Sequence, residues 1–278
     1  MTRSLRTALF HGMSAALAIA FLFPLLWVLL NSLKTKDEAN QQPPSWFPHS
    51  LSLANYRNLT TFDQGITTYL TNSVLVSVFT VIGSVVVCVL GGYGFARFTF
   101  RGKNLLFGTT LAILMVPYAT LLIPLYVLLG HIGLRNSLVG VALVLTLYQL
   151  PFAMFMMRIS FEAVPREIEE AAMVDGCGTF GVLRRIMLYA VWPGLITVGL
   201  FAFLAAWNDF FAPLILVSDS TKAPLPLAIA NLRQQTMGAI DFGATQAGVV
   251  VMAVPCLLLF VLLQRHYVRG FMSGAVGK

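Results

Sequence analysis

Six long apolar runs constrain the fold of this chain more than any other feature of its sequence. They extend over about Ala8 to Leu30, Leu70 to Ala96, Leu105 to Leu129, Leu138 to Met157, Ala190 to Val217 and Ala244 to Leu263. A helix of about 20 residues, at about 1.5 Å per residue, crosses a hydrocarbon core of about 30 Å. The sequence therefore predicts an all-α integral membrane protein with six transmembrane helices.

The composition supports this class and excludes others. Of the 278 residues, 58% are hydrophobic and 10% are charged, which is too little polar surface for a soluble globule. The formal net charge of +7 does not indicate nucleic acid, because no Lys/Arg run or basic stripe interleaved with aromatic residues occurs. Cys88, Cys177 and Cys256 have no metal-ligand spacing, so we expect reduced packing residues.

Basic residues in the connections predict the orientation. Twelve Lys and Arg lie at the ends of runs that share a side with the N-terminus, and six lie at the opposite ends. Cytoplasmic loops of membrane proteins carry an excess of Lys and Arg. Both termini are therefore predicted to be cytoplasmic, and the polar connection at 31–69, which has room for short helices only, is predicted to be extracytoplasmic.

A polar stretch at 164–176 holds four of the 11 acidic residues and falls on the predicted cytoplasmic side. Pro165 suits a first helical position and Gly176 suits a stop, so a short helix is predicted here, with a second one after it. The small side chains of Ala171 and Ala172 suit a helix that sinks into a groove of another protein. The alternative is an amphipathic linker on the membrane surface, but such a helix prefers Lys or Arg on its polar face.

Chemistry for an enzyme is not evident. The four histidines never pair at a metal-binding spacing, and Gly102-Lys103 is followed by Asn104 where a phosphate-binding loop needs Ser or Thr. We therefore expect no catalytic residue, no cofactor and no metal in this chain. Any hydrolysis of ATP would occur in a partner protein.

Asp209 is the only acid well within a predicted span, in the sequence Trp207-Asn208-Asp209. An ionisable group in a membrane segment usually faces the bundle interior or a water-filled cavity. These three residues are therefore possible parts of a solute pathway. The alternative is a structural carboxylate hydrogen-bonded to a neighbouring helix or to a partner subunit.

Proline and glycine interrupt several spans. Pro24, Pro117, Pro124 and Pro255 lie inside apolar runs, and Gly91-Gly92-Tyr93-Gly94 ends the second run. In a bundle, these residues allow kinks and close contacts between helices. They are also compatible with a bundle that bends to change the side to which it opens.

One spaced motif resembles the EAA signature of ATP-binding-cassette importer permeases. It consists of Glu170-Ala171-Ala172, three residues, Gly176, nine residues, and then Ile186 and Leu188. The family usually has Pro after this Leu, where this sequence has Tyr189. Further similarity to maltose-type (MalG-like) carbohydrate permeases covers nearly the whole chain, in Pro24-Leu25-Leu26-Trp27, Ser32-Leu33-Lys34, Asn72-Ser73, Tyr93-Gly94-Phe95-Ala96-Arg97, Trp207-Asn208-Asp209 and Ser273-Gly274-Ala275-Val276.

The resemblance implies a type I importer permease fold and a set of partners. These partners are two copies of a cytoplasmic ATPase, which binds the ATP, a second related permease, an extracytoplasmic solute-binding protein and membrane lipid. The residues that it implies for coupling to the ATPase are Glu170, Ala171, Ala172, Gly176, Ile186 and Leu188. A tail contact with the ATPase is implied for Ser273, Gly274, Ala275 and Val276, although the chain ends Gly277-Lys278 where the family usually ends Lys-Gly.

We therefore expect the permease subunit of an importer that moves a sugar or sugar-like solute across the cytoplasmic membrane. The alternative is an ion-coupled secondary carrier or channel that works without an ATPase. The expected organisation is a cytoplasmic N-terminus and first span (1–30), an extracytoplasmic loop (31–69), a five-helix transport core (70–267) with coupling helices at about 165–188, and a cytoplasmic tail (268–278).

Overall fold

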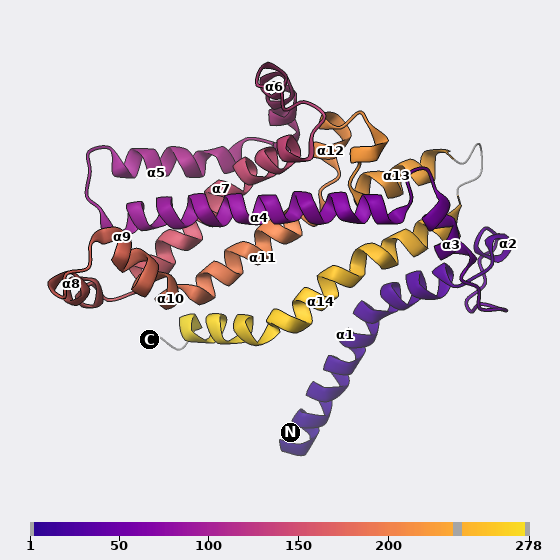
Figure 1. Cartoon of the computed structure of the whole chain (residues 1–278). Helices are drawn as coiled ribbons and strands as arrows, with labels where there is room; N and C mark the ends of the chain where they lie inside the picture. The colour runs from indigo at the N-terminus through magenta and orange to yellow at the C-terminus, as the bar shows by residue number, and fades with distance from the viewer. Residues whose placement is uncertain (1–2, 236–240, 276–278) are drawn as a thin grey trace. The chain divides into compact units, whose positions relative to one another are not determined.

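The computed structural model describes residues 3–235 and 241–275, and every regular element in these ranges is a helix. The predicted all-α class is confirmed. The chain divides into two compact units, one formed by residues up to 67 together with 228–257, and the other by 68–227 together with the residues from 258 onward. Figure 1 shows the helices in chain order.

The first unit begins with α1 (Arg3–Ser32), which is a continuous helix despite Pro24 in its interior. Its segment Leu9–Ser32 has the length and hydropathy of a membrane span, and none of its most apolar window is buried within the chain. A helix that is apolar all round and exposed is suited to lipid or to a partner helix. The first predicted span is thereby confirmed as a helix.

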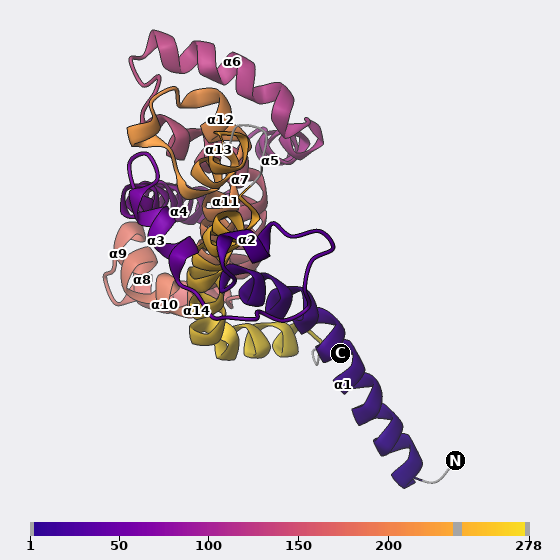
Figure 2. The ribbon, with the colours of Figure 1, turned by 90° about the vertical axis from the view of Figure 1, so that its right-hand side faces the viewer.

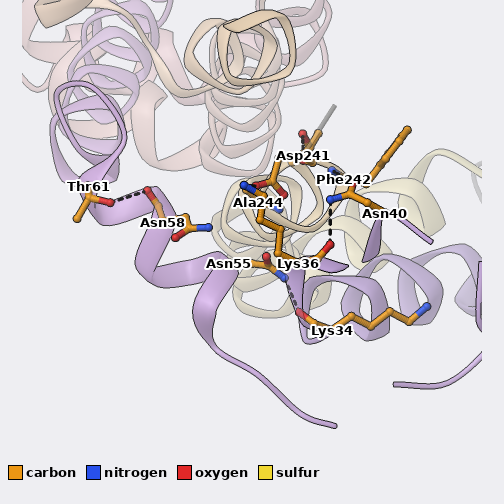
Figure 3. A network of polar contacts seen from close by, with 10 residues as sticks. Lys34, Lys36, Asn40, Asn55, Asn58, Thr61, Asp241, Phe242 and Ala244 are labelled. Atoms are coloured by element: carbon orange, nitrogen blue, oxygen red, sulfur yellow. Dashed lines mark hydrogen bonds and ion pairs between the residues drawn. The ribbon is translucent and has the colours of Figure 1, made fainter. Parts of the chain in front are cut away.

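The connection after α1 contains only two short helices, α2 (Lys36–Ala39) and α3 (Ala54–Thr61), as predicted. Asn55 is fully buried, and its Nδ2 donates to the carbonyl oxygens of Ser32 at 3.0 Å and of Lys34 at 2.8 Å. Figure 3 shows the bond to Lys34. These carbonyls lie at the end of α1, where a helix leaves them without intrahelical partners. The Asn55 side chain therefore closes the end of the span.

The same unit contains the start of α14 (Phe242–Ala275), whose first turn is capped from two sides. Asp241 Oδ1 accepts the backbone N–H of Ala244 at 3.0 Å, and Asn40 Oδ1 accepts that of Phe242 at 3.1 Å (Figure 3). Asp and Asn oxygens are preferred partners for the free N–H groups of a first helical turn. This polar network connects the loop after α1 to the beginning of the last helix.

The second unit is organised around α7 (Leu138–Glu162), which packs against α5, α6, α11 and α12. Its elements in chain order are α4 (Ile66–Arg97), α5 (Lys103–Ala112), η1 (Ile113–Met115), α6 (Tyr118–His131), α7, α8 (Arg166–Val174), α9 (Thr179–Val182), the π-helical turn η2 (Leu183–Met187), α10 (Leu188–Ala190), α11 (Trp192–Asn208), α12 (Phe211–Leu216) and η3 (Ser220–Lys222). Helix α13 (Leu225–Gln235) begins in this unit, and α14 ends in it.

Helices α4 and α7 approach closely at the glycines that the sequence singles out. A Cβ on Gly92 would lie 2.7 Å from Met157 Cβ and 3.1 Å from the backbone nitrogen of Arg158. Only a residue without a side chain fits at this distance. The predicted close helix contact is confirmed, while the bending of the bundle stays a prediction.

Asn72 and Ser73, near the start of α4, hold the segment that follows η3. Asn72 Nδ2 donates to the carbonyl oxygens of Thr221 at 2.9 Å and Ala223 at 3.0 Å, and Ser73 Oγ accepts the N–H of Leu225 at 2.8 Å. These bonds satisfy backbone groups that an irregular segment would otherwise bury unpaired. The Asn-Ser pair therefore shapes the loop that leads into α13.

Four of the predicted runs correspond to continuous helices, and two helix pairs are apolar enough to be spans but are bent; the second pair begins at Thr179, before the predicted fifth run. The bent pairs are Lys103–Met115 with Tyr118–His131, at 106°, and Thr179–Ala190 with Trp192–Asn208, at 80°. Counting each pair as one span gives six. Figures 1 and 2 show α6 turned away from the direction of α5.

The third predicted run, Leu105 to Leu129, is therefore not one straight helix. Helix η1 ends at Met115, Val116 is extended (φ −83°, ψ 125°), and Pro117 caps α6. Proline lacks an N–H and disfavours a helical conformation in the residue before it, which accounts for the break.

The fifth predicted run, Ala190 to Val217, is also interrupted. Helix α11 ends at Asn208, and a short helix α12 follows from Phe211. The prediction that Asp209 lies inside a span is wrong, because it lies at the break with extended backbone (φ −71°, ψ 128°).

Candidate functional site

The acidic stretch folds as the predicted helix, α8. Pro165 was predicted at the first helical position. Instead it has extended backbone (φ −56°, ψ 139°) and stands one residue before the helix, which begins at Arg166. Glu167 and Glu169 lie in the first turn, where carboxylates stabilise the positive end of the helix dipole.

Gly176 ends this helix in the predicted way. Its φ is +87°, a left-handed conformation that glycine adopts without a Cβ penalty. The N–H groups of Gly176 and Cys177 donate to the carbonyl oxygens of Met173 and Ala172, both at 3.0 Å. This is the double hydrogen bond of a Schellman turn, which satisfies the last carbonyls of the helix and reverses the chain.

Helix α8 has one buried and one exposed face. Ala172 is 6% exposed and packs in a core that includes Tyr93 and Phe161. Glu170 and Ala171 are exposed. The small side chain of Ala172 therefore serves packing within this chain, and a partner can reach only Glu170 and Ala171 of the EAA triplet.

Large apolar side chains are also exposed in α8 and at the start of α9. Met173 is 43% exposed, Val174 87% and Phe180 69%. Exposed apolar side chains that are close together and mixed with polar groups mark a surface that binds another molecule. We call Glu170, Ala171, Met173, Val174 and Phe180 the docking surface.

The second predicted helix runs from Thr179 to Ala190 and includes the π-helical turn. Ile186 and Leu188 are half-buried and pack against the same core as Ala172. Tyr189, which stands where the related permeases usually have Pro, is exposed, and the helix continues past it to Ala190. The chain then turns by 80° into α11, whose first turn contains Pro193.

Sequence reasoning missed the residues that attach α8 to the rest of the unit. Glu169 is 7% exposed; it accepts a hydrogen bond from the Tyr93 hydroxyl, and its Oε2 lies 3.1 Å from Arg97 Nε. Tyr93 and Arg97 stand four residues apart at the end of α4, a spacing that places both side chains on one helix face. That spacing was the available signal, but it does not identify Glu169 as the partner.

The three possible pathway residues lie at the end of α11 in different environments. Trp207 is buried and stacks on Phe203, with ring centroids 5.5 Å apart. Asn208 is exposed, and its Nδ2 donates to the carbonyl of Leu204 in its own helix. Asp209 Oδ1 accepts the Ala212 N–H at 2.8 Å and so caps α12.

A pocket of about 180 Å³ elsewhere in this unit does not include these three residues. Aliphatic side chains and the rings of Tyr118 and Tyr148 line it, from η1, α6 and α7. No group of His, Cys, Asp and Glu suited to a metal ion occurs among the described residues.

The implied tail contact falls at the end of the chain. Ser273, Gly274 and Ala275 are the last residues of α14, and Val276 lies outside the described residues.

Comparisons with known proteins agree with this architecture. The sequence profile of the family described as "Binding-protein-dependent transport system inner membrane component" matches residues 89–272. The diacetylchitobiose uptake system permease protein DasC of Streptomyces coelicolor is 34% identical over 278 residues, which cover 99% of each chain. The sulfoquinovosyl glycerol transport system permease protein SmoH of Agrobacterium fabrum is 33% identical over 95% of this chain and 91% of its own.

The fold has a counterpart among solved structures. A chain in the crystal structure of a bacterial ABC transporter involved in the import of the acidic polysaccharide alginate superposes with a TM-score of 0.80. The match covers 95% of this chain and 98% of that chain, at 20% identity.

Proposed function

This chain belongs to the family of binding-protein-dependent transport system inner membrane components, and from this premise we propose that it forms one permease subunit of an ATP-driven sugar importer. The observation that carries the proposal is the docking surface formed by residues of α8 and by Phe180 of α9. It presents an acidic residue and apolar side chains on a helix that is anchored from its other face. A helix of this kind fits a groove in another protein.

The proposed partners follow from the family and from this surface. Its members depend on a solute-binding protein, and we propose one as the extracytoplasmic partner. Two copies of a cytoplasmic ATPase would bind ATP and receive the docking surface, and a second, related permease would complete the pathway. With both termini in the cytoplasm, α8 lies on the side where ATP is available.

The solute class comes from the relatives. DasC and SmoH are named for diacetylchitobiose and sulfoquinovosyl glycerol, both of which are glycosides. We propose a glycoside or small oligosaccharide for this chain as well. Neutral and anionic glycosides are both represented, so the net charge of the chain does not select between them.

We also propose that Trp207, Asn208 and Asp209 contribute to the solute pathway. Replacing Asp209 with Asn removes the charge but keeps an oxygen that can cap the Ala212 N–H. Asp209→Asn is therefore expected to change the rate of solute uptake several-fold while the complex still assembles. Equal losses of uptake and assembly, or no change in either, would assign Asp209 to structure alone.

Reconstitution tests the whole proposal. The chain would be assembled in proteoliposomes with a second permease, an ATPase and a binding protein from the same organism. Uptake of labelled diacetylchitobiose, trehalose and other glycosides is expected to require the binding protein and ATP, and to stop when the ATPase cannot hydrolyse ATP. Uptake by the permease without its ATPase, driven by an ion gradient, would instead identify a secondary carrier.

A further inference from the structure

A buried ion pair joins α8 to the C-terminal end of α4. Arg97 Nε lies 3.1 Å from Glu169 Oε2, and the two side chains are 6% and 10% exposed. Arg97 Nη2 also donates to the carbonyl of Val164 at 2.7 Å, and the Tyr93 hydroxyl donates to Glu169 Oε1. One carboxylate of α8 is thus held by two side chains from a single turn of α4.

This pair differs from the ion pairs at the surface. Arg158 and Glu162, for example, are 22% and 44% exposed and belong to the same helix. Burying two charges has a large desolvation cost, and well-packed apolar residues are often equally or more stable in such a place. Stability alone is therefore a weak explanation for the presence of Arg97 and Glu169. Buried charges and hydrogen bonds do, however, fix the geometry between the two helices that carry them.

The ion pair lies where α8 begins, so the geometry that it fixes is that of α8 relative to α4. Val164 lies two residues before the start of α8, so Arg97 contacts both the segment that leads into the helix and its first turn. Ala172, one turn later, packs in the same core as Tyr93. Figure 1 shows α8 beyond the end of α4, and the chain itself connects α8 only to α7 and α9. Without the ion pair and the Tyr93 hydrogen bond, α4 would contact α8 through apolar packing alone.

We propose that Tyr93, Arg97 and Glu169 are positioning residues of transport, which make α8 and the end of α4 move as one body. A displacement of the docking surface by the ATPase would then reach α4, a membrane-spanning helix, directly. Packed side chains and hydrogen-bonded groups between two sites can carry coupling of this kind. The inference rests on the proposed function, because it assumes that the docking surface binds an ATPase.

Glu169→Gln in the reconstituted importer tests the inference, with Glu167→Gln as the matched control. Both substitutions remove one carboxylate from the first turns of α8, but Glu167 is exposed. The measured quantities are the solute transported per ATP hydrolysed and the ATPase retained on the purified complex. Glu169→Gln is expected to lower transport per ATP by about fivefold or more, within the range of coupling mutations, with the ATPase retained. Glu167→Gln is expected to match the unmodified importer.

Two results would overturn the inference. One is a transport-to-ATP ratio for Glu169→Gln equal to that of the control, and the other is a loss of transport that only follows a loss of bound ATPase. If Glu169→Gln does not assemble at all, Tyr93→Phe decides, because it removes a single hydroxyl and keeps the ion pair. A lowered ratio for Tyr93→Phe supports the inference, and an unchanged ratio refutes it. Failure of the unmodified importer to couple uptake to ATP would refute the proposed function instead.

Discussion

At the scale of single residues, the turn after α8 depends on the backbone of Gly176. A Cβ at this position meets no atom within 4 Å, so the only obstacle to a side chain is the φ of +87°. Gly176→Ala is expected to destabilise the turn by about 1–2 kcal/mol, the cost of a left-handed conformation for an L-residue. A lower midpoint of thermal denaturation in detergent would show this.

Gly178 offers a matched control for that substitution. It lies two residues later and has a φ of −69°, and a Cβ added there would likewise meet no atom within 4 Å. Gly178→Ala is therefore expected to leave the midpoint unchanged or to raise it slightly. Equal midpoints for the two variants would contradict the role assigned to the φ of Gly176.

The pKa of the Glu38 carboxyl group gives a second prediction at the scale of single residues. Burial raises the pKa of Glu38, but hydrogen bonds from the His49 N–H at 2.9 Å and the Ser45 hydroxyl at 2.9 Å, with His49 Nδ1 at 2.8 Å, together hold the pKa below its ordinary value. The folded chain thus holds this proton less tightly than the unfolded chain. The carboxylate stabilises the fold above the unfolded pKa of about 4.3, and the contribution is lost as the pH falls through the lower folded pKa.

Melting curves at several pH values test this linkage. The midpoint of the unmodified chain is expected to fall as the pH is lowered from about 6 to about 3, and Glu38→Gln is expected to reduce that dependence. Asp37→Asn, at the exposed neighbouring residue, serves as the control. The assignment fails if Asp37→Asn and Glu38→Gln flatten the pH dependence to the same extent.

At the scale of helices, the contact between α4 and α7 rests on Gly92. Gly92→Ala would place a methyl group 2.7 Å from Met157 Cβ, so the helices must separate locally. Overpacking of this kind is expected to lower the free energy of unfolding by about 1–3 kcal/mol. Gly94→Ala, two residues further along α4, meets nothing within 4 Å and should stabilise the helix slightly. Chemical denaturation of both variants compares them, and a stable Gly92→Ala variant would refute the tight contact.

At the scale of the whole molecule, burial is distributed very unevenly. Leu122 in α6 is fully buried, whereas Leu26 in α1 is 54% exposed. Leu122→Ala is expected to lower the free energy of unfolding of the purified chain by about 2–5 kcal/mol, because it leaves a cavity. Leu26→Ala is expected to change it by less than about 1 kcal/mol. Comparable losses measured in detergent would show that α1 packs within the chain after all.

Much of this organisation follows from short segments and was therefore predictable. Long apolar runs predict membrane helices because lipid leaves no other way to satisfy the backbone. The stop at Gly176 follows from the conformation that glycine alone adopts freely, and it is confirmed. The EAA motif identified the family, since its spacing can be read along a single stretch of chain.

Other features depend on groups that meet only in the folded chain. The sequence by itself determined the all-α class, most of the long helices and the position of α8, because each of these depends on hydropathy and backbone preference within one segment. Only the tertiary structure decided that Ala172 is buried while Glu170 is exposed, that Asp209 lies at a break, and that Glu169 meets Tyr93, 76 positions away. Burial and ion pairing depend on which distant segments pack together, and a local sequence pattern does not contain that information.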